Sequence, residues 1–332
     1  MAEHALIEQL DQAIDQMLAG SEQTGSADVT LSALLEIAGA LRDLPDDGFK
    51  TRLGLELQAS SKRSTRMTSS TRIEPLESAA DDRVAIHSVT AFISVPEGDK
   101  LIEFMKRTFA AEETTRHQHG PAGFVAGVRI GDSDLLIMGD ESARGQELPA
   151  ALHVYVKDCD ATYQRALAAG AVTLGGPGVG EPADRPYGER AAFVQDPFGN
   201  YWFIATRHGS NYVGVGLGHV TPSLLPSKAA PVLDFLKRAF GAEVEGAHEV
   251  AGRLVHAFVR IGKVMLEIGE AEEKPRPFGF YMQTEDVDAL YHRAMAAGAT
   301  SILPPADQLY GDRLAIVADP AGNRWFAAKR IE

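Results

Sequence analysis

One part of this chain is repeated further along, in the same order and at the same spacing. The segments Tyr187-Gly188-Glu189-Arg190 and Asp196-Pro197-Phe198-Gly199-Asn200 recur 123 residues later in each case (187 to 310, and 196 to 319), as Tyr310-Gly311-Asp312-Arg313 and Asp319-Pro320-Ala321-Gly322-Asn323. An Asp-x-Asp segment that opens a helical pattern is duplicated as well, at 158–166 and 286–294. This agreement indicates a tandem duplication of one domain of somewhat more than about 100 residues.

The duplication divides the 332 residues into four parts. We expect a helical N-terminal region at 1–57, a Ser- and Thr-rich linker at 58–84, and two repeated domains at 85–208 and 216–332. Each repeat is long enough to bury a core of its own. The three short amphipathic helices expected at the N-terminus are too small to bury a core of their own, so they need another surface to pack against.

The composition limits the kinds of partner. A formal net charge of −14 repels phosphate backbones and anionic lipids, so we expect neither nucleic-acid nor membrane binding. The single cysteine, Cys159, excludes an intrachain disulfide and is typical of a cytoplasmic protein. It is expected at a small buried position rather than as a nucleophile.

Each repeat shows the same sequence of elements twice, a strand and a helix followed by further strands. This pattern predicts an α+β fold. In the first repeat the predicted strands and helices fall at 89–95, 100–109, 124–130, 135–138, 152–156, 160–169, 191–195 and 201–205. His117 and His119 precede Gly-Pro-Ala-Gly and are expected at an exposed hairpin tip.

A βαβββ unit used twice per domain, with Asp-Pro-x-Gly-Asn turning into the last strand, resembles the vicinal oxygen chelate superfamily. That group includes glyoxalases, bleomycin-resistance proteins, extradiol dioxygenases and methylmalonyl-CoA epimerases. The Tyr-Gly-(Asp/Glu)-Arg element resembles its phosphonate-operon-associated, glyoxalase-like branch. The resemblance covers about residues 85–332 and implies tandem domains of paired βαβββ modules, which pair within the chain; it leaves open a homodimer as well. Turn chemistry explains Asp196, Gly199, Asp319 and Gly322, so these are predicted to be structural.

The resemblance also implies where a divalent metal would bind. In metal-dependent members the last strand carries a carboxylate seven residues after the Asp of Asp-Pro-x-Gly-Asn, and here Phe203 and Phe326 stand at those positions. The first-strand ligand positions fall at or beside Thr90 and Thr221, and near Ala151 and Gly279.

One carboxylate remains in register with the family's metal ligands. It is Glu267, whose counterpart in the first repeat is expected to be Ile137. Because a catalytic metal generally needs three protein ligands, we expect no metal cofactor. If a divalent metal binds, the expected ligands are Glu267 with His219 or His256.

Without a metal, the open half-barrel of each repeat still offers an aromatic, weakly polar lining. Its predicted ligand is an aromatic or amphipathic small molecule. The candidate ligand-binding residues are His153, Tyr155, Tyr187, Arg190, Trp202, Tyr281, Tyr310, Arg313 and Trp325. The two Tyr/Arg pairs can instead be structural, each Arg bracing a loop carboxylate.

Three functional hypotheses follow. The first is a metal-independent binding protein of the sequestering or bleomycin-resistance kind. The second is a lyase or isomerase in which burial raises the pKa of Glu267 so that it acts as the general base, with His256 relaying the proton. The third is a regulatory module in which a ligand repositions the N-terminal helices.

Overall fold

The computed structural model describes residues 85–119, 123–175, 178–209, 216–250, 253–271 and 276–331. The predicted N-terminal helices and linker lie outside these residues. The described part is a mixed α+β structure of two tandem glyoxalase-type domains, in which four helices of ten to twelve residues accompany two large sheets. No helix in this part of the chain is long and apolar enough to cross a bilayer.

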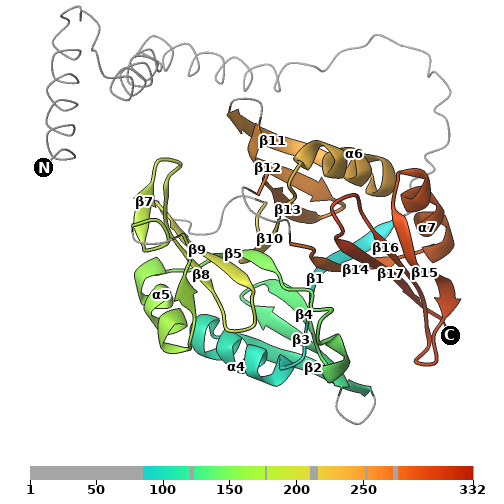
Figure 1. Ribbon diagram of the computed structural model, residues 1–332, viewed down its shortest axis with the longest axis horizontal. Coiled ribbons are helices and arrows are strands. Elements are labelled where there is room, and N and C mark those ends of the chain that lie inside the picture. Colours follow the sequence, from blue (N-terminus) through green and yellow to red (C-terminus); the bar gives the residue numbers. More distant parts are fainter. Residues whose placement is uncertain are drawn as a thin grey trace, which may run out of the picture. The chain divides into compact units, whose positions relative to one another are not determined.

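Four βαβββ-type modules follow one another along the chain (Figure 1). The first consists of β1 (Ile86–Val95), α4 (Gly98–Phe109), β2 (Glu112–His119), β3 (Gly123–Ile130) and β4 (Ser133–Gly139), followed by the short helix η1 (Glu141–Ala143). The second consists of β5 (Ala151–Tyr155), α5 (Cys159–Ala168), β6 (Val172–Thr173), β7 (Ala183–Arg185), β8 (Glu189–Gln195) and β9 (Tyr201–Arg207).

The second repeat has the same order. Its first module consists of β10 (Val220–Leu224), α6 (Ala229–Phe240), β11 (Glu243–Val250), β12 (Arg253–Ile261) and β13 (Val264–Ile268). Its second consists of β14 (Gly279–Thr284), α7 (Val287–Ala296), β15 (Thr300–Asp307), β16 (Asp312–Ala318) and β17 (Arg324–Arg330).

Each sheet combines one module from each repeat (Figure 1). The first sheet has the strand order β15-β16-β17-β14-β1-β4-β3-β2, and the second has β11-β12-β13-β10-β5-β9-β8-β6, with β7 paired to β8. The two repeats join where β1 runs antiparallel to β14 and where β10 runs antiparallel to β5. The prediction of intrachain pairing is therefore confirmed. The prediction that each repeat forms its own open half-barrel is wrong, because each sheet is built from modules of both repeats.

The helices cover one face of each sheet, and strand periodicity decides which residues they bury. In β5, Leu152 and Val154 are fully buried in the main core, whereas His153 and Tyr155 point to the opposite face. We call this opposite, helix-free side the inner face. The indoles of Trp202 and Trp325 lie on the helix side with no exposed surface, packed against Phe109 and Phe240 respectively.

The repeated Asp-x-Asp and Tyr-Gly-x-Arg segments contact one another, which explains why both recur. Asp158 caps α5 by accepting from the Ala161 amide at 2.9 Å. The next acid, Asp160, accepts from Arg190 Nη2 at 2.7 Å. In the second repeat Asp286 caps α7, and the Asp288–Arg313 pair has the same 2.7 Å bond. Each arginine thus ties a helix N-terminus to a strand.

The Asp-Pro-x-Gly-Asn turns are held by a buried carboxylate. Asp196 accepts from the amides of Phe198 and Asn200, from Asn200 Nδ2 and from Trp202 Nε1, all at 2.8–2.9 Å. Gly199 has a φ of +92°, a conformation that residues with a Cβ rarely adopt. Asp319 makes the same contacts in the second repeat, so the structural role predicted for both turns is confirmed.

In the part of the chain that the structure describes, none of the four edge strands was predicted from the sequence, and β7 was not predicted either; the edge strands are β2, β6, β11 and β15. All eight residues of β11 are exposed, and β15 contains two prolines, so neither shows an alternating apolar pattern. His117 is exposed, as expected. It lies within the polar strand β2, however, so its expected place at the hairpin tip is wrong.

Candidate functional site

The inner face of the second sheet brings polar side chains of both repeats together. His153 on β5 lies beside Phe203 on the parallel strand β9 and opposite Thr221 on β10. Ser223 on β10 lies beside Glu267 on the parallel strand β13. We refer to the inner-face residues His153, Glu189, Thr221, Ser223 and Glu267 as the polar floor.

The center of the polar floor is a His–Glu pair. His153 Nδ1 lies 3.1 and 3.2 Å from the two carboxylate oxygens of Glu267. The hydroxyl of Ser223 donates to Glu267 Oε2 at 2.8 Å, and His256 Nε2 lies 3.8 Å from the same oxygen. Glu267 is buried, and both of its oxygens are already hydrogen-bonded, by His153 and Ser223.

The electrostatics favour an ion pair. Burial acts to raise the pKa of Glu267, but the charge and hydrogen bond of His153, together with His256, outweigh it and hold that pKa well below its usual range. Burial acts to lower the pKa of His153, but the carboxylates of Glu267 and Glu189 outweigh it and raise that pKa. The expectation that burial raises the pKa of Glu267 toward neutrality is therefore wrong.

A second buried carboxylate, Glu189 on β8, lies on the other side of His153. Its Oε2 is 3.6 Å from His153 Nε2, and its Oε1 accepts from the Tyr155 hydroxyl at 3.1 Å. Arg207 Nε lies 3.6 Å from the same Oε1. Burial, followed by the nearby Glu189 charge, raises the pKa of Tyr155, which keeps this phenol protonated.

Neither Glu189 nor Ser223 was predicted as a site residue from the sequence. Glu189 belongs to the repeated Tyr-Gly-Glu-Arg element, but its period-two spacing with Ala191 and Phe193 also places it on one strand face with them. Ser223 follows Thr221 by the same spacing. The period-two spacing along each strand is therefore the sequence feature that could have identified both residues.

Aromatic rings flank the polar floor. The His153 imidazole stacks on Tyr155 with centroids 4.5 Å apart and planes 18° apart, and Phe203 approaches it edge-on at 6.5 Å. Phe193 packs edge-on against Phe203 at 5.6 Å. Tyr155 and Phe193 also belong to a small apolar cluster that is separate from the main core. The site thus combines polar groups with flat apolar surfaces.

The corresponding inner face of the first sheet has a phenol and apolar side chains in place of His153, Ser223 and Glu267. Tyr281 and Phe326 occupy the positions of His153 and Phe203, and Phe92 and Leu136 occupy those of Ser223 and Glu267. The Phe92 and Phe326 rings pack 4.7 Å apart. The predicted counterpart of Glu267, Ile137, is wrong by one residue: the hairpins align at their Arg-Ile-Gly turns, which leaves Ile137 on the helix side with no exposed surface.

The donors of the second sheet do not fit the metal site that the family's metal-dependent members imply. Of the four ligand positions, Ala151, Phe203 and Thr221 offer no carboxylate or imidazole, and Glu267 is held by His153 and Ser223. The described residues contain no group of three or more His, Cys, Asp or Glu side chains that could hold a metal ion. His219 lies elsewhere, with Nδ1 2.9 Å from Asp132.

Several predicted ligand residues lie away from the polar floor. Trp202 and Trp325 are in the helix-side core, and Arg190 and Arg313 are bonded to aspartates. Tyr187 and Tyr310 are about 60% exposed, at 62% and 59%, in the turns before β8 and β16. Tyr281 lies on the inner face of the first sheet, where its hydroxyl donates to Asp312 at 3.4 Å.

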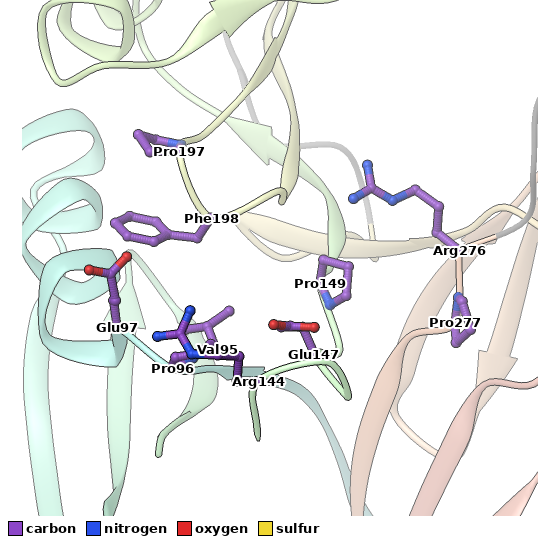
Figure 2. Close-up of a pocket in the computed structure, with 10 residues that line it drawn as sticks. All are labelled: Val95, Pro96, Glu97, Arg144, Glu147, Pro149, Pro197, Phe198, Arg276 and Pro277. Atoms are coloured by element: carbon purple, nitrogen blue, oxygen red, sulfur yellow. The ribbon is translucent and has the colours of Figure 1, made fainter. Parts of the chain in front are cut away.

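An open groove of about 520 Å³ lies apart from the polar floor, where the links between modules meet. Figure 2 shows Pro197 and Phe198 on one side of it and Arg276 and Pro277 on the other. Its charged side chains have structural partners: Arg276 donates to the Gly199 carbonyl at 2.6 Å and stacks over the Tyr201 ring. The groove therefore presents no buried reactive group.

Comparison with known proteins agrees with this architecture. The family model of the Glyoxalase/Bleomycin resistance protein/Dioxygenase superfamily matches residues 85–204 and 216–326, so the chain belongs to this superfamily. It is 37% identical over 120 residues to the uncharacterized proteins Mb0911c of Mycobacterium bovis and Rv0887c of Mycobacterium tuberculosis, covering 79% and 71% of them and 32% of this chain.

The fold is also similar to solved structures. Glyoxalase I from Zea mays superposes with a TM-score of 0.55 at 15% identity, over 73% of this chain and 92% of the maize chain. At that identity the similarity concerns the fold alone. The function must be argued from the residues of the site.

Proposed function

We propose that this protein binds a small organic molecule on the inner face of the second sheet, without a metal, as a sequestering or bleomycin-resistance-type binding protein. The observation that carries the proposal is the buried His153–Glu267 pair on the polar floor. A buried ion pair of this kind is weak evidence for stability, since apolar residues of similar size often stabilise a core as well or better.

The duplication strengthens this argument. The central strands of both sheets pair in the same register, yet the first sheet has Tyr281, Phe92 and Leu136 at the matching positions. The fold therefore does not require His153, Ser223 or Glu267. These polar groups are not needed for the fold, yet they are gathered in one place and have perturbed pKa values. This clustering is evidence for a functional site.

Binding fits the geometry better than general-base catalysis by Glu267. A base must accept a proton from the substrate, but His153 and Ser223 occupy the oxygens of this carboxylate and its pKa is held low. The second candidate, a lyase or isomerase of the glyoxalase or epimerase type, rests on the 3.8 Å approach of His256 to Glu267, which offers a route for the proton.

Glu267→Gln distinguishes the two candidates. The substitution keeps the side-chain shape but removes the carboxylate charge that raises the pKa of His153. For a binding protein we expect affinity for ligands found in a small-molecule screen to fall about tenfold, with no turnover in either protein. For an enzyme, turnover is lost while binding is retained. Asp312→Asn on the first sheet is the matched control and should change neither quantity.

Two finer assignments belong to the same proposal. The Tyr-Gly-(Asp/Glu)-Arg element, present in both repeats, supports a place in the phosphonate-operon-associated, glyoxalase-like branch. The single cysteine supports a cytoplasmic location. Its thiol is buried, donates to the Ile204 carbonyl, and has a pKa that burial raises to about 12, so it takes no part in the proposed chemistry.

A further inference from the structure

Three buried polar atoms on the polar floor have no hydrogen-bond partner among the described residues. They are Nε2 of His153, Oε2 of Glu189 and Oγ1 of Thr221. Glu189 and Thr221 are at least nine-tenths buried, with 5% and 1% of their surface exposed. Because buried polar groups are nearly always paired in native proteins, this cluster marks the place where a ligand atom is expected.

The first two of these atoms have opposite hydrogen-bonding roles. Nδ1 of His153 faces the Glu267 carboxylate and Nε2 faces the Glu189 carboxylate, so both ring nitrogens are directed at acceptors and Nε2 is assigned as an N–H donor. The Glu189 oxygen can only accept. They are 3.6 Å apart, too far for a good direct hydrogen bond, but a single oxygen atom can lie about 2.8 Å from both.

Only some chemical groups satisfy both atoms. A carboxylate or phosphate accepts from His153 but is repelled by Glu189 and cannot donate to it. An ammonium group donates to Glu189 but is repelled by the imidazolium. An ether or ketone oxygen accepts but has no hydrogen to give. A neutral hydroxyl both accepts and donates, and Thr221, directly opposite His153, can turn its own hydroxyl toward it.

The surroundings select the skeleton that carries the hydroxyl. Tyr155, Phe203 and Phe193 present ring surfaces beside the unpartnered atoms. We infer that the second sheet binds an uncharged planar aromatic molecule through a ring hydroxyl placed between His153 Nε2 and Glu189 Oε2. This inference rests on the proposed function and specifies its ligand class.

The first sheet does not offer the same arrangement. Asp312, the counterpart of Glu189, accepts from Tyr281 and from Arg330 Nη1 at 2.9 Å, and its neighbour at the His153 position is a phenol without a positive charge. No unpartnered donor and acceptor face one another there among the described residues. Asp312→Asn is therefore a suitable control for substitutions of Glu189.

The test uses three matched probes with the full-length protein: 2-naphthol, its methyl ether 2-methoxynaphthalene, and 2-naphthoate, with dissociation constants measured by calorimetry near neutral pH. We expect 2-naphthol to bind at least about tenfold more tightly than the ether, because the charge-assisted bond to Glu189 is lost in the ether, and 2-naphthoate to bind weakest. Glu189→Gln should reduce the preference for the hydroxyl to within about threefold, because the amide can donate to an ether oxygen.

A spectroscopic measurement keeps the test independent of how well the variants fold. In ¹⁵N NMR spectra of the wild-type protein, 2-naphthol should shift the His153 Nε2 resonance and the ether should shift it less. Equal affinities for 2-naphthol and the ether, both lost in His153→Phe, would overturn the hydroxyl inference and leave the proposed function standing.

Two other outcomes also overturn the inference. One is that none of the three probes binds the second sheet while other compounds from a broad screen do. The other is a crystal structure of the 2-naphthol complex in which an ordered water alone bridges His153 and Glu189. If no compound from the screen binds in a His153-dependent way, the proposed function itself fails.

Discussion

His153 and Glu267 lie in different repeats, 114 residues apart in sequence, yet Nδ1 of the histidine is 3.1 Å from the glutamate carboxylate. The contact exists because β5 pairs with β10, and β10 in turn pairs with β13. The site is therefore a product of the pairing between repeats. Neither repeat contains it alone.

The first prediction concerns the pH dependence of this pair. The pKa of His153 is raised above 6.5, so its stabilising contribution is complete below that value and is lost as pH rises through the folded-state pKa. The pKa of Glu267 is lowered from 4.5, so its contribution is present above 4.5 and is lost as pH falls through the folded-state pKa. The pair should therefore stabilise the folded protein most between pH 4.5 and pH 6.5.

A double-mutant cycle measures this coupling. Urea unfolding of the wild type, His153→Gln, Glu267→Gln and the double variant should give a coupling energy of about 1–3 kcal/mol near pH 5.5. The value should fall as the pH is raised from 5.5 through the folded-state pKa of His153, because the imidazole loses its charge there. A coupling that stays constant over this range would show that the charge on His153 contributes nothing.

The second prediction concerns the two Asp-Pro-x-Gly-Asn turns. Asp196→Ala removes four hydrogen bonds to a buried carboxylate and leaves the Trp202 indole without its acceptor. The free energy of unfolding should fall by about 3 kcal/mol or more. Asp319→Ala should have a similar effect, because its contacts are the same.

The exposed acid Asp134 provides the control. Asp134 is exposed and pairs with Arg129 on the adjacent strand, so Asp134→Ala should change the unfolding midpoint much less. Comparable losses in all three variants, measured by chemical denaturation, would contradict a special role for the turn carboxylates.

The third prediction concerns metals. Incubation with Ni, Co, Mn, Fe or Zn ions should leave the melting temperature of the wild type unchanged within about 1 °C, since tight binding to the native state would raise it. The physical reason is that Glu267 is the one strong ligand at the four family positions and is already paired. Stoichiometric metal, measured by elemental mass spectrometry and removed by Glu267→Ala, would contradict this prediction.

A designed variant serves as the positive control. Ala151→His combined with Phe203→Glu adds an imidazole and a carboxylate at two of the family's ligand positions and leaves Glu267 as the third ligand. This double variant should acquire metal-dependent stabilisation, because three protein ligands suffice for a divalent site.

Much of the fold could be predicted from the sequence, because the duplication states each module twice. The turns at Asp196 and Asp319 and the helix starts at Asp158 and Asp286 follow from local chemistry, and local chemistry is visible in sequence. Glu267 stood out because it is the one carboxylate in register with the family's metal-ligand positions.

The partners of Glu267 could not be predicted in this way. Periodicity assigns residues to a face of a strand but does not say which strand lies next to it, so the sequence does not distinguish Arg253 or Arg260 from His153 as the partner of Glu267. The structure pairs Arg260 with Glu245 and directs His153 to Glu267. The polar edge strands were missed for a related reason: residues without a buried face leave no hydrophobic pattern.

The last prediction follows from the pairing of the repeats. A fragment of residues 85–209 has two strands, β1 and β5, whose partners β14 and β10 lie in the missing repeat. Such unpaired inner edges are strongly prone to pairing with another chain. By the equivalence of the modules, β1 of one copy should pair with β5 of the other, which makes the fragment a homodimer.

Analytical ultracentrifugation of each fragment and of their mixture tests this arrangement. We expect residues 85–209 and 216–331 to form dimers separately and a heterodimer after refolding together. Only the heterodimer restores the contact between His153 and Glu267, so only the mixture should recover the raised pKa of His153 in an NMR titration. A folded, monomeric fragment would show that a repeat can close its own sheets, and the site would then have to be sought within one repeat.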